Sequence, residues 1–118
     1  FLYGDADLNG IIARLNAFEE AGVDVLFAPG LPDLDAVRAV CSSVSAPVNV
    51  LIHGKLAKCS REELAEAGAA RISLGGALAF DAYAAMLETA RAIKEGGSFD
   101  ALKTRGSARK EISSFLPG

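Results

Sequence analysis

The residues best suited to acid–base chemistry fall close together in PVNVLIHGKLAKCS, which begins at Pro47. His53 is the single histidine of the chain, and histidine changes charge more readily near neutral pH than other side chains. Lys55 and Lys58 can neutralise an acidic substrate from the same loop, and Asn49 shares a strand face with His53 if the strand is regular. We therefore expect His53 to be a catalytic acid or base and Asn49 to contact the substrate. The alternatives are a loop histidine and surface lysines without a role, and an Asn49 amide whose partner is structural rather than a ligand.

Glycines mark the ends of two further apolar runs. In RISLGGALAF, Gly75 and Gly76 separate a strand pattern from a helical pattern. Bare backbone N–H groups and the positive end of a helix dipole can hold a phosphate or carboxylate at such a turn. The other interpretation is a tight turn that only lets the helix pack closely. Gly30 ends the stretch VDVLFAPG and is a further candidate substrate contact, which supplies shape rather than chemistry. None of these loops holds the acidic pair that a metal site would need.

The two cysteines, Cys41 and Cys59, are too few for a disulfide scaffold and lack the spacing of a zinc site. Cys59 precedes a predicted helix start, where a helix dipole can lower a thiol pKa, but the spacing fixes no base beside it. We expect Cys41 to fill the core and the protein to work in a reducing cytoplasm.

The composition limits the classes of protein that the chain can form. It has 118 residues, of which 51% are hydrophobic, so one domain can bury a core. The formal charge of −3 argues against a nucleic-acid partner, and no apolar run is long enough to span a membrane. The basic segment Lys103 to Lys110 is predicted to be a solvated face, with a binding patch as the alternative.

Three nearly continuous apolar stretches predict buried strands, namely VDVLFAPG from Val23, PVNVLIHG from Pro47 and RISLGG from Arg71. Helical patterns separate and flank them, over Leu8 to Phe18, Asp33 to about Cys41, Ser60 to Gly68 and Tyr83 to Ile93. Predicted helix boundaries are Asp7 and a Ser60–Glu63 capping box at starts, and Gly22, Gly68 and Gly96–Gly97 at ends.

This alternation predicts an α/β fold with a parallel sheet and right-handed crossovers. The strand stretches start at 23, 47 and 71, a constant step of 24 residues. Counting back one step places a further strand just before Phe1, so FLYGDAD is predicted to leave a strand that the sequence lacks. We expect a piece of a larger α/β protein. The alternative is that Phe1 to Tyr3 forms the edge strand of a small complete sheet.

The stretches EEAGVDVLFAPG, PVNVL and RISLGGAL together resemble the carboxyl-terminal part of the isocitrate lyase and phosphoenolpyruvate mutase superfamily over about residues 7 to 97. The resemblance implies the last part of a (β/α)8 TIM barrel, with strands six to eight and their flanking helices in residues 1–97. Residues 98–118 would form tail helices, which this family commonly exchanges between subunits, so a homo-oligomer is expected.

The resemblance also implies lyase or phosphonomutase chemistry on small α-keto or dicarboxylic acids, through an enolate held by Mg²⁺. The metal ligands belong to the part of the family's barrel that this chain lacks, so the chain alone is expected to be inactive. Pro29 and Gly30 stand where lyases tend to carry Glu and phosphonate enzymes His, which favours a carboxyphosphonoenolpyruvate mutase-like or decarboxylase-like branch. A non-catalytic half-barrel assembly module and a stand-alone anion-binding domain are the alternatives.

Overall fold

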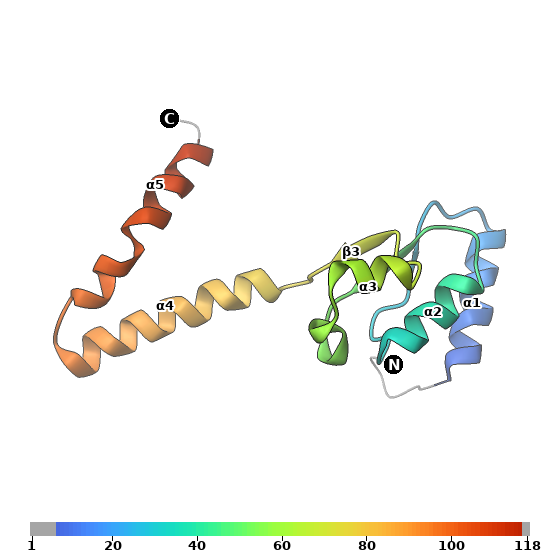
Figure 1. The fold of residues 1–118 in the computed structure, drawn as a ribbon, viewed down its shortest axis with the longest axis horizontal. Helices are drawn as coiled ribbons and strands as arrows, with labels where there is room; N and C mark the ends of the chain where they lie inside the picture. Colours follow the sequence, from blue (N-terminus) through green and yellow to red (C-terminus); the bar gives the residue numbers. More distant parts are fainter. Residues whose placement is uncertain (1–6, 117–118) are drawn as a thin grey trace. The chain divides into compact units, whose positions relative to one another are not determined.

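The computed structural model describes residues 7–116, apart from the side chains of residues 103–107. The chain divides into two compact units, residues 1–75 and residues 76–118, and each is described by itself (Figure 1). The boundary predicted between residues 97 and 98 falls inside the second unit and stays a prediction. The expectation for FLYGDAD falls outside the described residues, except at Asp7.

The first unit alternates helices and strands as predicted (Figure 1). Its elements are α1 (Leu8–Glu20), β1 (Leu26–Phe27), α2 (Leu34–Ser42), β2 (Val48–Leu51), the 3₁₀ helix η1 (Gly54–Lys58), α3 (Arg61–Glu66) and β3 (Arg71–Ser73). The strands form one parallel sheet in the order β1-β2-β3. Phe27 pairs with Asn49, and Asn49 pairs with Arg71, so these three residues share one face of the sheet.

Short polar side chains start the helices and position the loops before them. The Asp33 carboxylate accepts a hydrogen bond from the Ala36 N–H at 3.1 Å and caps α2. Ser60 and Glu63 form the predicted capping box of α3, each accepting a hydrogen bond from the other's backbone N–H. Both helices therefore begin close to where the sequence predicts, just after the loops that follow β1 and β2.

The core of the first unit lies between the sheet and its helices. Its fully buried side chains come from β1, β2, α2 and η1 among others, and the largest are Leu26, Leu31, Leu56, Val37, Val40, Val48 and Val50. The Glu19 carboxylate at the end of α1 also accepts hydrogen bonds from the Ser45 and Ala46 N–H groups. This contact ties α1 to the loop that leads into β2.

The prediction that all three strands are buried is wrong for β1, and none of the residues of β3 is buried either. Successive strand residues point to opposite faces, and Leu26 is buried while Phe27 is 48% exposed. Val25 is 49% exposed, so the apolar run alone did not indicate two covered faces. The strands are also shorter than the predicted stretches, because the pairing stops where the loops begin.

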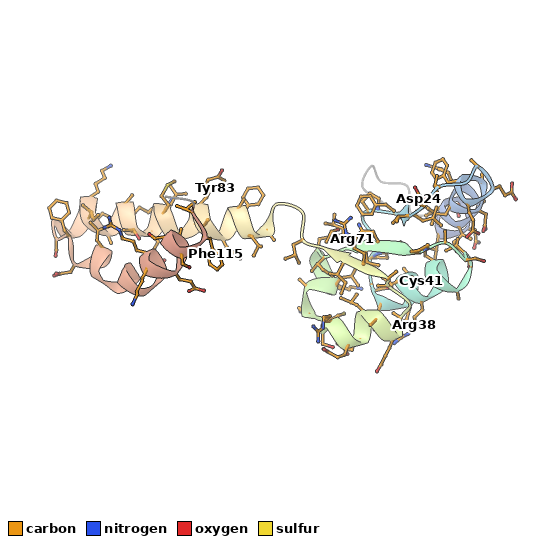
Figure 2. The ribbon with its side chains drawn as sticks, turned by 90° about the horizontal axis from the view of Figure 1, so that it is seen from above. Asp24, Arg38, Cys41, Arg71, Tyr83 and Phe115 are labelled. Atoms are coloured by element: carbon orange, nitrogen blue, oxygen red, sulfur yellow. The ribbon has the colours of Figure 1, made fainter. Side chains whose placement is uncertain are left out.

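The second unit consists of α4 (Ala77–Gly96), the 3₁₀ helix η2 (Asp100–Arg105) and α5 (Gly106–Phe115). Gly97 ends α4 as predicted, with a φ of 63°. None of the residues of α4 is buried, and Tyr83 on α4 and Phe115 on α5 are exposed (Figure 2). Of the basic segment, Arg109 and Lys110 are exposed as predicted, whereas the side chains of Lys103 and Arg105 lie outside the described residues.

Gly68 offers a test of the packing between α3 and α2. Its φ is +98°, and a Cβ there would lie 2.6 Å from the Cys41 Cβ, whereas at Gly22 (φ +84°) a Cβ would meet nothing within 4 Å. We expect Gly68→Ala to lower the free energy of unfolding by about 2–4 kcal/mol through strain and a clash. The control Gly22→Ala should cost only about 1–2 kcal/mol through backbone strain. Urea denaturation followed by circular dichroism measures both, and equal losses would contradict the packing.

Candidate functional site

The carboxyl ends of the three strands meet at one edge of the sheet, because the strands are parallel. The loops after β1 and β2 and the turn after β3 therefore bring three of the predicted site residues, Gly30, His53 and Gly75, to the same edge. Ligands of α/β proteins bind at this edge, where the loops and helix starts supply polar groups.

His53 lies two residues beyond the end of β2 and occupies the N-cap position of η1. Its backbone carbonyl accepts a hydrogen bond from the Leu56 N–H at 3.0 Å, which fixes the start of the loop. The side-chain Nε2 atom is buried and has no hydrogen-bond partner among the described residues. A buried polar atom without a partner is costly, so this nitrogen is a good candidate for contact with a ligand.

Asn49 lies deeper, on the same face of β2, and is 5% exposed. Its Nδ2 donates a hydrogen bond to the Ser73 Oγ at 3.0 Å, and that hydroxyl donates to the Val50 carbonyl at 3.4 Å. Because the Ser73 hydroxyl donates its proton to the Val50 carbonyl, the Ser73 oxygen can only accept the bond from Asn49. The Asn49 side chain is therefore oriented with its NH₂ group toward Ser73. Asn49 Oδ1 has no partner among the described residues.

Asn49 and His53 occupy different depths of the sheet. His53 lies four residues after Asn49 and beyond the end of β2, and the last strand residue, Leu51, lies between them in the chain. The structure thus places His53 at the edge of the sheet and Asn49 nearer its middle, bonded across to β3. A direct contact of either residue with a substrate stays a prediction.

The candidate glycines occupy three separate positions. Gly30 is buried after β1, with a φ of 91°. Gly75 follows β3 with a φ of +55°, and a Cβ there would lie 3.2 Å from Leu51 Cδ1. Gly76 belongs to the second unit, where it is the N-cap residue of α4. Gly75 belongs to the first unit and Gly76 to the second, and an anion site that uses both glycines stays a prediction.

The sequence did not indicate the contact between Asp33 and Lys55. Lys55 Nζ lies 3.9 Å from Asp33 Oδ2, while Asp33 Oδ1 caps α2. This ion pair joins the loop after β1 to the loop after β2. The sequence places Asp33 directly after Pro32, in a loop at the end of a strand. This position predicts the start of a helix and does not indicate an ion pair with Lys55.

Cys41 lies on α2 (Figure 2), packs against the core and has a thiol pKa raised by burial. It borders a pocket of about 280 Å³ at the ends of α2 and α3, lined by Arg38, Cys41, Ser42, Glu66, Ala67 and Gly68. Helices that connect parallel strands run back along the sheet, so this pocket lies away from the carboxyl ends of the strands. Cys59 Sγ lies 4.0 Å from the Lys55 carbonyl oxygen, and its use as a nucleophile stays untested.

The raised pKa of Cys41 predicts a slow and pH-shifted alkylation. The thiolate is the form that attacks iodoacetamide, and raising the pKa lowers the thiolate fraction at a given pH. In a Cys59→Ser variant, we expect the pH midpoint of Cys41 alkylation to lie above that of a terminally blocked cysteine peptide, whose thiol has the ordinary pKa of about 8.5. Mass spectrometry measures the rates, and a midpoint at or below the reference would show that burial has no such effect.

The described residues contain no group of three or more His, Cys, Asp or Glu side chains that could hold a metal ion. None of the helices that they form is long and apolar enough to cross a membrane.

The sequence matches the family model for phosphoenolpyruvate phosphomutase over residues 1–94. A curated relative, 2-methylisocitrate lyase from Shewanella oneidensis, is 40% identical over 60 residues, which cover 49% of this chain and 20% of that protein. This match extends over much less of the relative than of the chain itself.

Three solved structures share the fold. A candidate lyase/mutase from Burkholderia cenocepacia is 42% identical with a TM-score of 0.86, covering 98% of this chain and 42% of that one. A candidate phosphonomutase from the same species is 34% identical with a TM-score of 0.60, covering 80% and 38%. Oxaloacetate acetylhydrolase in complex with oxalate is 20% identical with a TM-score of 0.69, covering 90% and 41%, and supports the fold alone.

The chain spans about two fifths of the length of these solved relatives. Their likeness confirms the predicted fold class, because the α/β sheet and its helices correspond to part of the TIM barrel of lyases and mutases. The family match covers most of the chain. The chain therefore belongs to the phosphoenolpyruvate phosphomutase family, within the isocitrate lyase and phosphoenolpyruvate mutase superfamily.

Proposed function

We propose that this chain forms part of the active site of a Mg²⁺-dependent lyase or mutase that acts on a small α-keto or dicarboxylic acid through an enolate. We also propose that this chain alone does not catalyse the reaction. Family membership supports the class of chemistry, and the span of about two fifths of the solved relatives supports a site completed by further residues. The relatives include a lyase/mutase, a phosphonomutase and a 2-methylisocitrate lyase, so the proposal covers both lyase and mutase chemistry.

One observation carries the assignment of the site to this edge of the sheet. His53 Nε2 is buried without a partner among the described residues, although the backbone of His53 is fixed at the start of η1. A neutral imidazole can accept or donate at this nitrogen. We assign it the role of holding or moving a proton on the substrate, as a general acid or base.

The other residues shape and support this position. Gly75 is exposed, and its lack of a side chain lets a ligand approach the backbone closely, whereas the buried Gly30, with its positive φ angle, shapes the loop after β1. The Asn49–Ser73 hydrogen bond holds β2 against β3 below the edge.

Mg²⁺ would offset the negative charge that develops on an enolate oxygen. The acidic residues of the described part of the chain do not gather into a site for it. We therefore assign none of its ligands to these residues.

The test is turnover of keto acids by the protein captured intact from its source cells, compared with this chain alone. We expect the captured protein to convert one of oxaloacetate, phosphonopyruvate or 2-methylisocitrate, to lose activity with EDTA and to recover it with Mg²⁺. A His53→Gln variant should lower kcat by about 10²–10⁴-fold, with Lys110→Met, an exposed residue of α5, as a control of nearly unchanged kcat. Turnover that resists EDTA, or that His53→Gln leaves intact, would refute the proposal.

We also propose that the second unit joins two copies of the chain. Its apolar side chains are exposed along α4 at helical spacing, including Tyr83 at 56%, Met86 at 58% and Leu87 at 48%. Such a stripe is unfavourable in water unless something covers it. A second copy presents the same stripe, as a symmetric interface requires.

Sedimentation of the purified chain at micromolar concentration tests this assembly. We expect the wild-type chain to sediment as an oligomer and Met86→Glu to shift it toward the monomer, because a charge in an apolar interface lacks a partner. Arg91→Glu, on the same helix, is the control and should leave the oligomer intact. A monomeric wild-type chain would contradict the proposal.

A further inference from the structure

Lys55 is the cation that joins the two loops at the carboxyl edge of the sheet. It lies two residues after His53, and its Nζ is 3.9 Å from Asp33 Oδ2. We infer that Lys55 binds a second acidic group of the substrate, a carboxylate or phosphonate, and that Asp33 competes with the substrate for it. This inference rests on the proposed function and names the residue that would hold the second acidic group at the same site.

The ion pair leaves Lys55 free to change partners. At 3.9 Å it is longer than a charge-assisted hydrogen bond of about 2.7–2.9 Å, and the two side chains are 78% and 42% exposed. Exposed pairs of this kind contribute little to stability. A ligand that offers Lys55 a closer oxygen can therefore displace Asp33 at low cost.

Asp33 keeps a partner when Lys55 leaves. Its Oδ1 accepts the hydrogen bond from the Ala36 N–H at the start of α2, and the positive end of the helix dipole favours the carboxylate there. The Asp33 charge thus stays in place and holds the ammonium group while no substrate is bound. A substrate with one acidic group gains less from releasing Lys55 than one with two.

The position of the pair links it to His53. Lys55 and His53 belong to one loop, and the backbone hydrogen bond from Leu56 N–H to the His53 carbonyl spans both residues. The unpartnered Nε2 of His53 calls for a polar ligand at the same edge. If Lys55 binds one acidic group of a small acid, the other end of that molecule would lie close to the loop that carries His53.

Isothermal titration of the intact protein with malonate, phosphonoacetate and acetate tests the inference without turnover. We expect malonate or phosphonoacetate to bind more tightly than acetate. Lys55→Met should weaken their binding about three- to tenfold and remove the preference, while the charge-matched control Lys110→Met on α5 should not.

Asp33→Asn should strengthen malonate binding about two- to fivefold, because the competitor loses its charge. Asparagine retains the N-cap of α2, so folding should be kept, and circular dichroism checks this. In the Lys55→Met background, Asp33→Asn should have no effect if it acts through Lys55. An equal gain in both backgrounds would mean general charge repulsion and would overturn the competition.

Absence of malonate binding, or equal affinities in wild type and Lys55→Met, would overturn the role of Lys55. These results are distinct from failure of the proposed function, which is measured by turnover of the captured protein. Phosphonoacetate binding that depends on Lys55 while malonate binding does not would restrict the second acidic group to a phosphonate.

Discussion

The pairing of β2 on both of its edges is the constraint on which the first unit depends. β2 lies between β1 and β3, and its Val48 and Val50 are buried completely or almost so. Because this strand cannot shift without turning its side chains to the wrong face, its end has one position. That end carries His53 and, through η1, Lys55. The packing of Val48 and Val50, rather than the loop itself, therefore determines where His53 and Lys55 lie.

Polar contacts also fix the position of β2 and of the loops around it. The Asn49–Ser73 bond joins β2 to β3, and the Glu19 carboxylate holds the loop before β2 against α1. The capped starts of α2 and α3 fix the ends of the loops after β1 and β2. The two loops are thus anchored at both ends, which leaves their side chains, above all Lys55, as the parts free to respond to a ligand.

Much of this could be predicted from the sequence, because it follows from local patterns. The order of elements, the capping box at Ser60 and the glycine ends of α1, α3 and α4 each depend on residues close in the chain. The exposed face of β1 could not be predicted, since Val25 and Phe27 are as apolar as buried residues. The Asp33–Lys55 pair and the unpartnered His53 Nε2 depend on which loops the sheet brings together, and no spacing along the chain indicates them.

The central claim is that the edge formed by the loops after β1 and β2 binds a small acid in the complete protein. A crystal structure of the intact protein with malonate or a keto acid tests it most directly. The claim predicts that His53 Nε2 lies within about 3.2 Å of the ligand or of a water bound to it, with Lys55 Nζ turned from Asp33 toward an acidic oxygen. If His53 Nε2 is instead bonded to another protein group and the ligand lies elsewhere, the site is wrongly assigned.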